Sequence, residues 1–146
     1  MNNRYLYRAK RTDNGEWIVG NRIDDEVTGQ VFIHAAGNTV NESDKVGEDG
    51  CLRFVAFEVD PSTICQCTGS NDKNRKLIFD NDIMVAHLDD EFPEDVTYER
   101  VMWHNNGFYM KQIGSDDYDL IDEFAQNNFE VCGNIFDNPE LLEAVE

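Results

Sequence analysis

The sequence predicts a mostly β fold: a small SH3-like barrel-type structure built from hairpins, with a few short helices and a C-terminal helix. Two observations favour strands over helices. Apolar residues alternate with polar ones over short segments through most of the chain, and two segments, 13–15 and 105–107, carry the Asn and Gly that tight hairpin turns need. Helical start signals occur only before short stretches.

The N-terminal half is expected to begin with a hairpin. Residues 5–9 and 17–20 are predicted strands that flank the turn Asp13-Asn14-Gly15. Residues 52–59 are apolar on both alternating faces toward their middle, which is typical of a core strand covered on both sides. Asp60-Pro61 then combines an N-cap residue with a proline at the first helical position, and predicts a single helical turn.

A short strand is predicted over residues 66–68, followed by a polar loop over 69–74 and another strand over 82–87. The block Phe79-x-x-Asp82-Ile83-x-Val85 is similar to the start of a strand in small SH3-like barrels, where a carboxylate caps the turn. Asp82 is therefore expected to hold a structural turn.

The remaining elements follow the same signals. Pro93 and acidic residues mark 88–96 as an exposed loop, and strands 99–103 and 108–113 form a second hairpin around Asn105-Asn106-Gly107, with a type I′ turn. A short helix is predicted over 119–126, and a terminal helix runs through Val145 with Asn138 as N-cap and Pro139 at its first position. The inward-facing residues of the first of these helices are expected to be Leu120, Ile121 and Phe124.

Length and composition predict one domain over residues 1–146, with residues 64–136 as a candidate compact β sub-barrel within it. A chain of 146 residues with 40% hydrophobic residues can bury one core of ordinary size. Its N-terminus lacks the apolar core of a signal peptide, and no apolar run is long enough to span a bilayer. We therefore expect a cytoplasmic protein.

The net charge of −18 is distributed unevenly. Residues 1–76 carry 10 Lys/Arg and 12 Asp/Glu, whereas residues 77–146 carry 2 and 18, which gives −2 and −16. A field of that sign repels nucleic-acid phosphates. An acidic surface that serves solubility is one interpretation. Attraction of a cationic partner, or mimicry of DNA charge to occupy a DNA-binding protein, is the other.

The sequence offers no catalytic site, metal site or cofactor site. The four cysteines fit reduced core thiols, since Cys65-x-Cys67 is too close for zinc-knuckle spacing and neither thiol has a base in sequence reach. The three histidines have no partnered nucleophile. The aspartates at 116–122 form the densest carboxylate cluster, but counting from Asp117 the EF-hand Gly and Glu positions hold other residues. We predict that the protein is not an enzyme.

Four segments carry a distinctive pattern in a fixed chain order. The first carries Tyr7-Arg8-Ala9-Lys10 and Trp17-Ile18-Val19-Gly20, and the third carries Val101-Met102-Trp103 before Asn106-Gly107-Phe108-Tyr109. The second and most specific runs from Val59 to Val85, and the last from Phe129 to Leu142. Together these segments cover 66 of the 146 residues and resemble the YopX family. Cys65, Cys67, Arg75 and Asn81 depart from the family pattern, and Arg75 and Asn81 stand where glycine would supply a positive φ angle.

The resemblance implies a phage- or prophage-derived accessory protein of the bacterial host cytoplasm, from a family without an established biochemical activity. We interpret it as a non-enzymatic interaction module with an unknown, basic protein partner, and exposed strand edges make a homo-oligomer conceivable. The candidate partner-binding loop consists of Gln66, Thr68, Gly69, Asp72, Lys73 and Asn74. The alternatives are a nucleic-acid-binding small β-barrel, if N-terminal basic residues gather with Lys73, Arg75 and Lys76, and an acidic DNA-mimic-like inhibitor of a DNA-binding protein.

Overall fold

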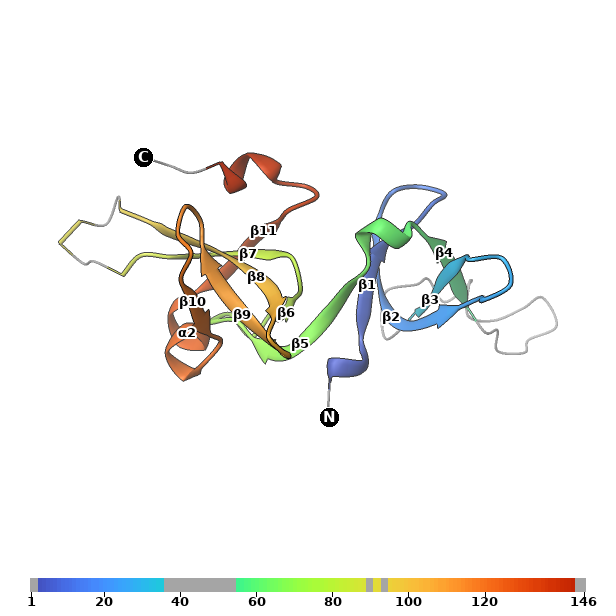
Figure 1. The fold of residues 1–146 in the computed structure, drawn as a ribbon, viewed down its shortest axis with the longest axis horizontal. Coiled ribbons are helices and arrows are strands. Elements are labelled where there is room, and N and C mark those ends of the chain that lie inside the picture. Colours follow the sequence, from blue (N-terminus) through green and yellow to red (C-terminus); the bar gives the residue numbers. More distant parts are fainter. Residues whose placement is uncertain (1–2, 36–54, 89–90, 93–94, 144–146) are drawn as a thin grey trace. The chain divides into compact units, whose positions relative to one another are not determined.

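The computed structural model describes residues 3–35, 55–88, 91–92 and 95–143 (Figure 1). The predicted mostly β class is confirmed: all strand pairs between the named elements are antiparallel, and they form one six-stranded and one five-stranded sheet. Neither sheet closes into a barrel, so the barrel part of the expectation gives way to two open sheets. The chain divides into two compact units, residues 1–66 and 67–146. The single-domain interpretation stays a prediction, and so does a compact sub-unit over residues 64–136, but the sheet in that part of the chain is open and is not a barrel.

The described part of the first unit contains η1 (Asn3–Tyr5), β1 (Tyr7–Lys10), β2 (Trp17–Asp24), β3 (Val31–Ala35), β4 (Ala56–Val59), η2 (Pro61–Thr63) and the start of β5 (Cys65–Asn71). The predicted hairpin of β1 and β2 is confirmed, with Gly15 at a φ of 74° in its turn. The predicted helical turn is also confirmed, because the Asp60 carboxylate accepts a hydrogen bond from Ser62 N at 3.0 Å. The core of this unit consists of Ala9, Ile18, Val31, Ile33 and Val59.

The expected core strand over residues 52–59 is wrong in its position. Residues 52–54 lie outside the described residues, and β4 is the last strand of the sheet order β4-β3-β2-β1-β5-β6. Its Val59 is buried and bridges to Arg11, whereas Glu58 is exposed. Among the described strands, the apolar run therefore serves an edge strand with one buried face.

The second unit contains the end of β5, β6 (Leu77–Phe79), β7 (Asp82–Ala86), β8 (Thr97–His104), β9 (Gly107–Gln112), β10 (Tyr118–Leu120), α2 (Glu123–Asn128), β11 (Glu130–Asn134) and η3 (Pro139–Leu142). The five-stranded sheet has the order β10-β9-β8-β7-β11 (Figure 1). The second hairpin, formed by β8 and β9, is confirmed, and Asn105 and Asn106 have the positive φ angles, 47° and 69°, of a type I′ turn. The core of the unit consists of Ile78, Met84, Ala86, Val101, Met110, Ala125 and Phe129.

Two helix predictions in this unit need correction. Residues 118–120 continue the sheet as β10, so α2 begins only after Asp122, whose carboxylate accepts a hydrogen bond from Ala125 N at 2.9 Å. This start places Ala125 and Phe129 in the core, four residues apart, and leaves Leu120 and Phe124 62% and 57% exposed. Of the three residues expected to face inward, Ile121 packs against the core.

The expected C-terminal helix is a short 3-10 helix, η3, within residues 139–142, and residues 144–146 lie outside the described part of the chain. Asn138 does not cap it with its side chain, because its Oδ1 atom accepts a hydrogen bond from Asn134 N at 3.2 Å. The amide thus closes the turn after β11. In the expected loop over 88–96, the described residues are exposed, as predicted.

Candidate functional site

Asp72 organises the loop that the sequence singled out as a partner-binding surface. Its carboxylate accepts three backbone hydrogen bonds, from Asn74 N and Lys76 N at 2.8 Å and from Val131 N at 2.9 Å. The side chain is 4% exposed. Since all three donors are main-chain groups, Asp72 fixes the turn and ties it to β11. Arg75, inside this turn, has a φ of 64°, which confirms the expected positive φ angle.

The other residues of the predicted loop have different surroundings. Gln66 belongs to the first unit, where its Nε2 donates a hydrogen bond to Arg4 O at 3.2 Å. Thr68 donates its hydroxyl to Ile78 O at 2.8 Å. Gly69, Lys73 and Asn74 are exposed, and Asn74 also donates its side-chain amide to Glu130 Oε2 at 2.9 Å. The interaction role of this loop stays a prediction that rests on those exposed residues.

Asp82 lies at the start of β7 and is completely buried. Its Oδ2 atom accepts a hydrogen bond from Phe79 N at 2.7 Å, across the turn between β6 and β7. Asn81, the residue before it, has the expected positive φ angle, 72°. The contact closes a tight turn between two strands and presents no group to solvent.

A pocket of about 450 Å³ lies between the strands β8, β9 and β10 and the helix α2, and we call it the carboxyl pocket. Apolar side chains make up most of its lining, and several of them, including Leu88, Leu120 and Phe124, are exposed. Glu99 of β8 lines it with only 4% of its surface exposed, and Asp119 of β10 lies next to it. The complete lining is Leu88, Glu99, Met110, Tyr118, Asp119, Leu120, Asp122, Phe124, Ala125 and Phe129.

The two carboxyl groups of this pocket interact directly. Burial, a hydrogen bond with the Asp119 side chain and the charge of Asp119 together raise the pKa of Glu99 from 4.5 to about 8. Glu99 therefore holds a proton at neutral pH, and its Oε1 atom has no hydrogen-bond partner among the described residues. Such a pair of carboxyl groups can release its proton when a bound cation occupies the position of that proton.

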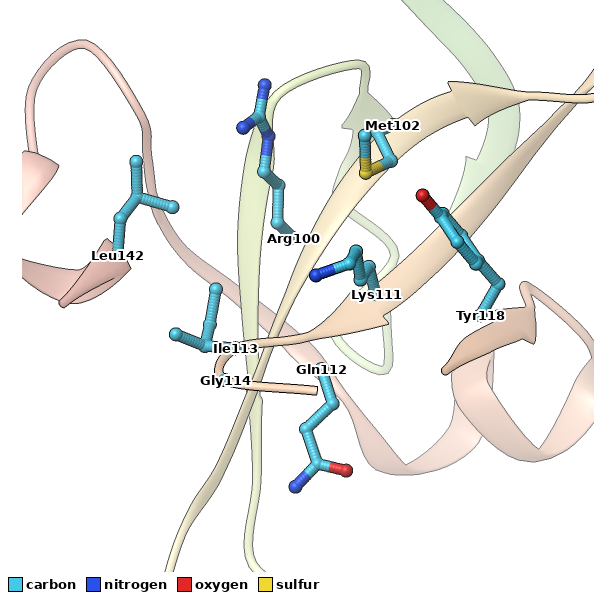
Figure 2. A pocket seen from close by; sticks show the side chains of 8 residues that line it. All are labelled: Arg100, Met102, Lys111, Gln112, Ile113, Gly114, Tyr118 and Leu142. Atoms are coloured by element: carbon cyan, nitrogen blue, oxygen red, sulfur yellow. The ribbon is translucent and has the colours of Figure 1, made fainter. Parts of the chain in front are cut away.

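A second pocket, of about 280 Å³, lies on the other face of the same sheet, and we call it the cation pocket (Figure 2). Glu99 and Arg100 are neighbours on β8, so their side chains point to opposite faces. Figure 2 shows side chains that come from β8, β9, the turn after β9, β10 and η3. The lining is Arg100, Met102, Lys111, Gln112, Ile113, Gly114, Tyr118 and Leu142.

Sequence reasoning missed both pockets, although each left a signal. Glu99 stands two residues before Val101 on a predicted strand, so a carboxyl group falls in the apolar phase of the alternation. Arg100 and Lys111 are the two basic residues of the acidic half. What the sequence could not supply is the register that pairs Arg100 with Lys111 and places Asp119 opposite Met110.

The thiols divide into two kinds. Cys65 and Cys67 are fully buried, as expected for core thiols, whereas Cys132 is exposed, which corrects that expectation for this residue. Cys51 lies outside the described residues. Within the described ranges, no group of three or more His, Cys, Asp or Glu residues is placed to hold a metal ion.

The N-terminal basic residues are engaged within the first unit. Arg8 and Lys10 lie over the Trp17 ring at 4.9 and 5.4 Å from its centroid, and Arg22 lies 5.6 Å from the Tyr7 ring. Arg11 pairs with the carboxylate of Asp13. These contacts give the basic groups local roles in packing.

The comparisons with known proteins bear on family and fold. The crystal structure of protein EF1440 from Enterococcus faecalis is similar to this chain, with a TM-score of 0.55, 22% sequence identity, and coverage of 94% of this chain and 96% of that one. At this identity the likeness concerns the fold. Among curated proteins, none matches the chain. In the described part of the structure, no helix has the length and apolar character needed to cross a membrane. The family model described as YopX protein matches residues 6–143, nearly the whole sequence, and the chain therefore belongs to the YopX family.

Proposed function

We propose that this protein is a non-enzymatic accessory protein of phage or prophage origin that binds a basic protein partner, and that the carboxyl pocket receives a cationic side chain of that partner. The observation that carries the proposal is the position of Glu99, 4% exposed beside Asp119 at the wall of a largely apolar pocket, where burial and Asp119 raise its pKa to about 8. A raised pKa of this kind, in a cleft, is characteristic of functional groups.

The physical reason is that a positive charge in the pocket would stabilise both carboxyl groups, Glu99 and Asp119, and satisfy their hydrogen bonds. At neutral pH a proton stands between the two carboxyl groups, and Glu99 Oε1 is unpaired among the described residues. An arginine or lysine head group would replace that proton and provide charge-assisted hydrogen bonds to both carboxylates. Exposed Leu88, Leu120 and Phe124 would cover the apolar part of the same side chain and its neighbours.

The charge of the chain favours the same partner. With a formal net charge of −18, the protein attracts basic proteins over a distance of about a Debye length, roughly 8–10 Å at physiological salt. Association driven by this field is fast and slows as salt is added. The long-range field brings the partner near, and the carboxyl pocket supplies the short-range selection for a cationic side chain with apolar neighbours.

The test is a titration with a short capped peptide that contains Arg beside Leu, against the matched peptide with neutral citrulline in place of Arg. We expect the Arg peptide to bind, and Glu99→Gln and Asp119→Asn to weaken it at least tenfold. The matched control is Asp117→Asn, which removes the same charge from an exposed residue outside the pocket and should change the affinity less than twofold.

The pH dependence separates the pocket from the general field. Because the cation displaces the Glu99 proton, affinity for the Arg peptide should rise about tenfold per pH unit between pH 6 and 7.5 and level off above about 8. Equal binding of the Arg and citrulline peptides, or an affinity that Asp117→Asn lowers as much as Glu99→Gln does, would contradict the proposal.

The two alternatives predict other results. A DNA mimic would bind DNA-binding proteins through its overall charge, so Glu99→Gln would leave that binding unchanged. A nucleic-acid-binding protein would form complexes with random double-stranded DNA at physiological salt, with an affinity that falls as salt is added. We expect no such DNA complex.

A further inference from the structure

The two basic residues of the acidic half occupy one place in the sheet. Residues 77–146 contain 18 Asp/Glu and only two Lys/Arg, Arg100 and Lys111. These two are direct partners across β8 and β9, in a row that continues to Ile83 on β7 and to Tyr118 on β10. Like charges directly opposite each other on neighbouring strands destabilise a sheet. The pairing therefore has a cost that a bound anion would offset.

The surroundings of the pair supply hydrogen-bond donors and exclude acids. Both residues line the cation pocket, and none of its eight lining residues carries a carboxylate (Figure 2). Arg100 Nη2 donates to Asn81 Oδ1 at 3.0 Å, which fixes the guanidinium, while its buried Nε has no hydrogen-bond partner among the described residues. Within the described part of the chain, neither Arg100 nor Lys111 makes an ion pair.

One wall of the pocket is held rigidly by aromatic stacking. Tyr118 stacks on His104 with ring centroids 3.8 Å apart and planes 7° from parallel, and both rings meet Tyr109 edge to face. Figure 2 shows Leu142 of η3 and Tyr118 of β10 among the side chains around Arg100 and Lys111. Met102 and Leu142 add apolar surface to this lining. The pocket thus joins two cations, of which Arg100 is held by Asn81, to aromatic and apolar surface.

We infer that the cation pocket is an oxyanion-binding site, for a small ligand that carries a phosphate or carboxylate group on an apolar body. Arg and Lys side chains together bind such groups through charge-assisted hydrogen bonds. The volume of about 280 Å³ suits a small molecule. The net charge of −16 on residues 77–146 opposes a long polyanion, whereas a small anion meets the two cations at short range. This site lies on the other face of the sheet from the carboxyl pocket, although Tyr118 lines both, and the inference does not depend on the proposed function.

The experiment is an NMR titration of the full chain at constant ionic strength, with sodium chloride as the balancing salt. The probes are inorganic phosphate, phenyl phosphate and benzoate. We expect saturable shifts of backbone amides around Arg100 and Lys111. Lys111→Gln should weaken the binding of the preferred probe at least tenfold. The matched control, Lys73→Gln, removes the same charge from an exposed residue elsewhere in the second unit and should change it less than twofold.

A second variant tests the unpaired Nε–H group of Arg100 without removing its positive charge. Arg100→Lys keeps the positive charge but lacks the guanidinium Nε–H, and should weaken binding about fivefold or more. Tighter binding of phenyl phosphate than of benzoate would assign the site to phosphate ligands, and the converse to carboxylates; both results support an oxyanion site. Binding of none of the three probes, or equal weakening by Lys73→Gln and Lys111→Gln, would overturn it. Glu99→Gln should leave this binding unchanged, so the two proposals can fail separately.

Discussion

Two carboxyl groups of the second unit are equally buried but have opposite kinds of neighbour. Asp72 and Glu99 are each 4% exposed. The Asp72 carboxylate accepts hydrogen bonds from three backbone N–H groups, those of Asn74, Lys76 and Val131. Glu99 instead lies beside another carboxyl group, that of Asp119, and its Oε1 is unpaired among the described residues. Burial alone does not say which of them serves structure.

The difference between these two regions is that burial of the Asp72 carboxylate stabilises the fold, whereas burial of the Glu99 carboxyl group costs stability that other contacts must offset. A carboxylate with three backbone donors has exchanged its water for fixed dipoles, so its burial is compensated. A carboxyl group that must keep a proton to remain buried is compensated only in part, and a ligand can improve its surroundings. The candidate site is therefore the pocket around Glu99, rather than the buried centre of the predicted loop.

The largest effect is expected from Asp72→Ala, which should lower the free energy of unfolding at pH 7 by about 4 kcal/mol. The substitution leaves three backbone donors without their acceptor in a buried turn, and buried charge networks lose several kcal/mol when one member is removed. Urea unfolding measures the change. The matched control, Asp117→Ala, alters an exposed aspartate and should stay within about 0.5 kcal/mol. Equal stability of the two variants would contradict the contrast with Glu99, because the hydrogen bonds of Asp72 would then contribute no measurable stability.

Glu99→Gln is expected to act in the opposite direction. The pKa of Glu99 in the folded state, about 8, lies above the unperturbed value of 4.5, so the folded protein keeps a proton that the unfolded chain has released between these pH values. The stabilisation is fully present below about pH 4.5 and is lost as pH rises through 8. The variant should match the native protein near pH 5 and exceed it by about 3 kcal/mol at pH 8.5.

Urea unfolding of both proteins over that pH range measures this divergence. Asp117→Asn again provides the control, because its curve should run parallel to that of the native protein. If the native and Glu99→Gln curves were parallel from pH 5 to 8.5, Glu99 would be an ordinary exposed acid, and the contrast with Asp72 would disappear.

The smallest effect is expected from Asn74→Ala, at the surface of the same turn that Asp72 organises. Its side-chain amide donates one exposed hydrogen bond to Glu130, and exposed contacts of this kind contribute about 0.5 kcal/mol or less. Thermal unfolding of Asn74→Ala and Asp72→Ala, measured side by side, would show how much of the stability of the loop comes from the buried carboxylate alone. A loss above about 2 kcal/mol would instead distribute it over the whole loop.

Some features of the fold follow from local signals that any reader of the sequence can find. The two hairpins are predicted by Asn and Gly at their turns, and the positive φ angles at Arg75 and Asn81 are predicted by their places in the family pattern. The helical turn after Asp60 follows from Asp and Pro in order. The hairpins and the helical turn depend on the backbone preferences of two to four neighbouring residues, whereas the φ angles of Arg75 and Asn81 were predicted from the family resemblance.

Other features were out of reach of local reasoning. The apolar pattern of residues 55–59 is the same for a central strand and for an edge strand with one buried face, so only the sheet order places β4 at an edge. The helix predicted over 119–126 failed because pairing with β9 extends the sheet through Leu120. In both cases the secondary structure and position of the segment were set by pairing with another strand, which local sequence does not show.

Composition, turn residues and motifs are therefore enough to predict the strand-rich class, the turns, the family and the charge asymmetry, because each can be read residue by residue. Three further features arise only in the folded chain: the sheets stay open, Asp119 meets Glu99, and the two cations of residues 77–146 stand opposite each other. These depend on strand register, and a shift of one residue would move every side chain of a strand to the other face. Both candidate pockets exist only through that register.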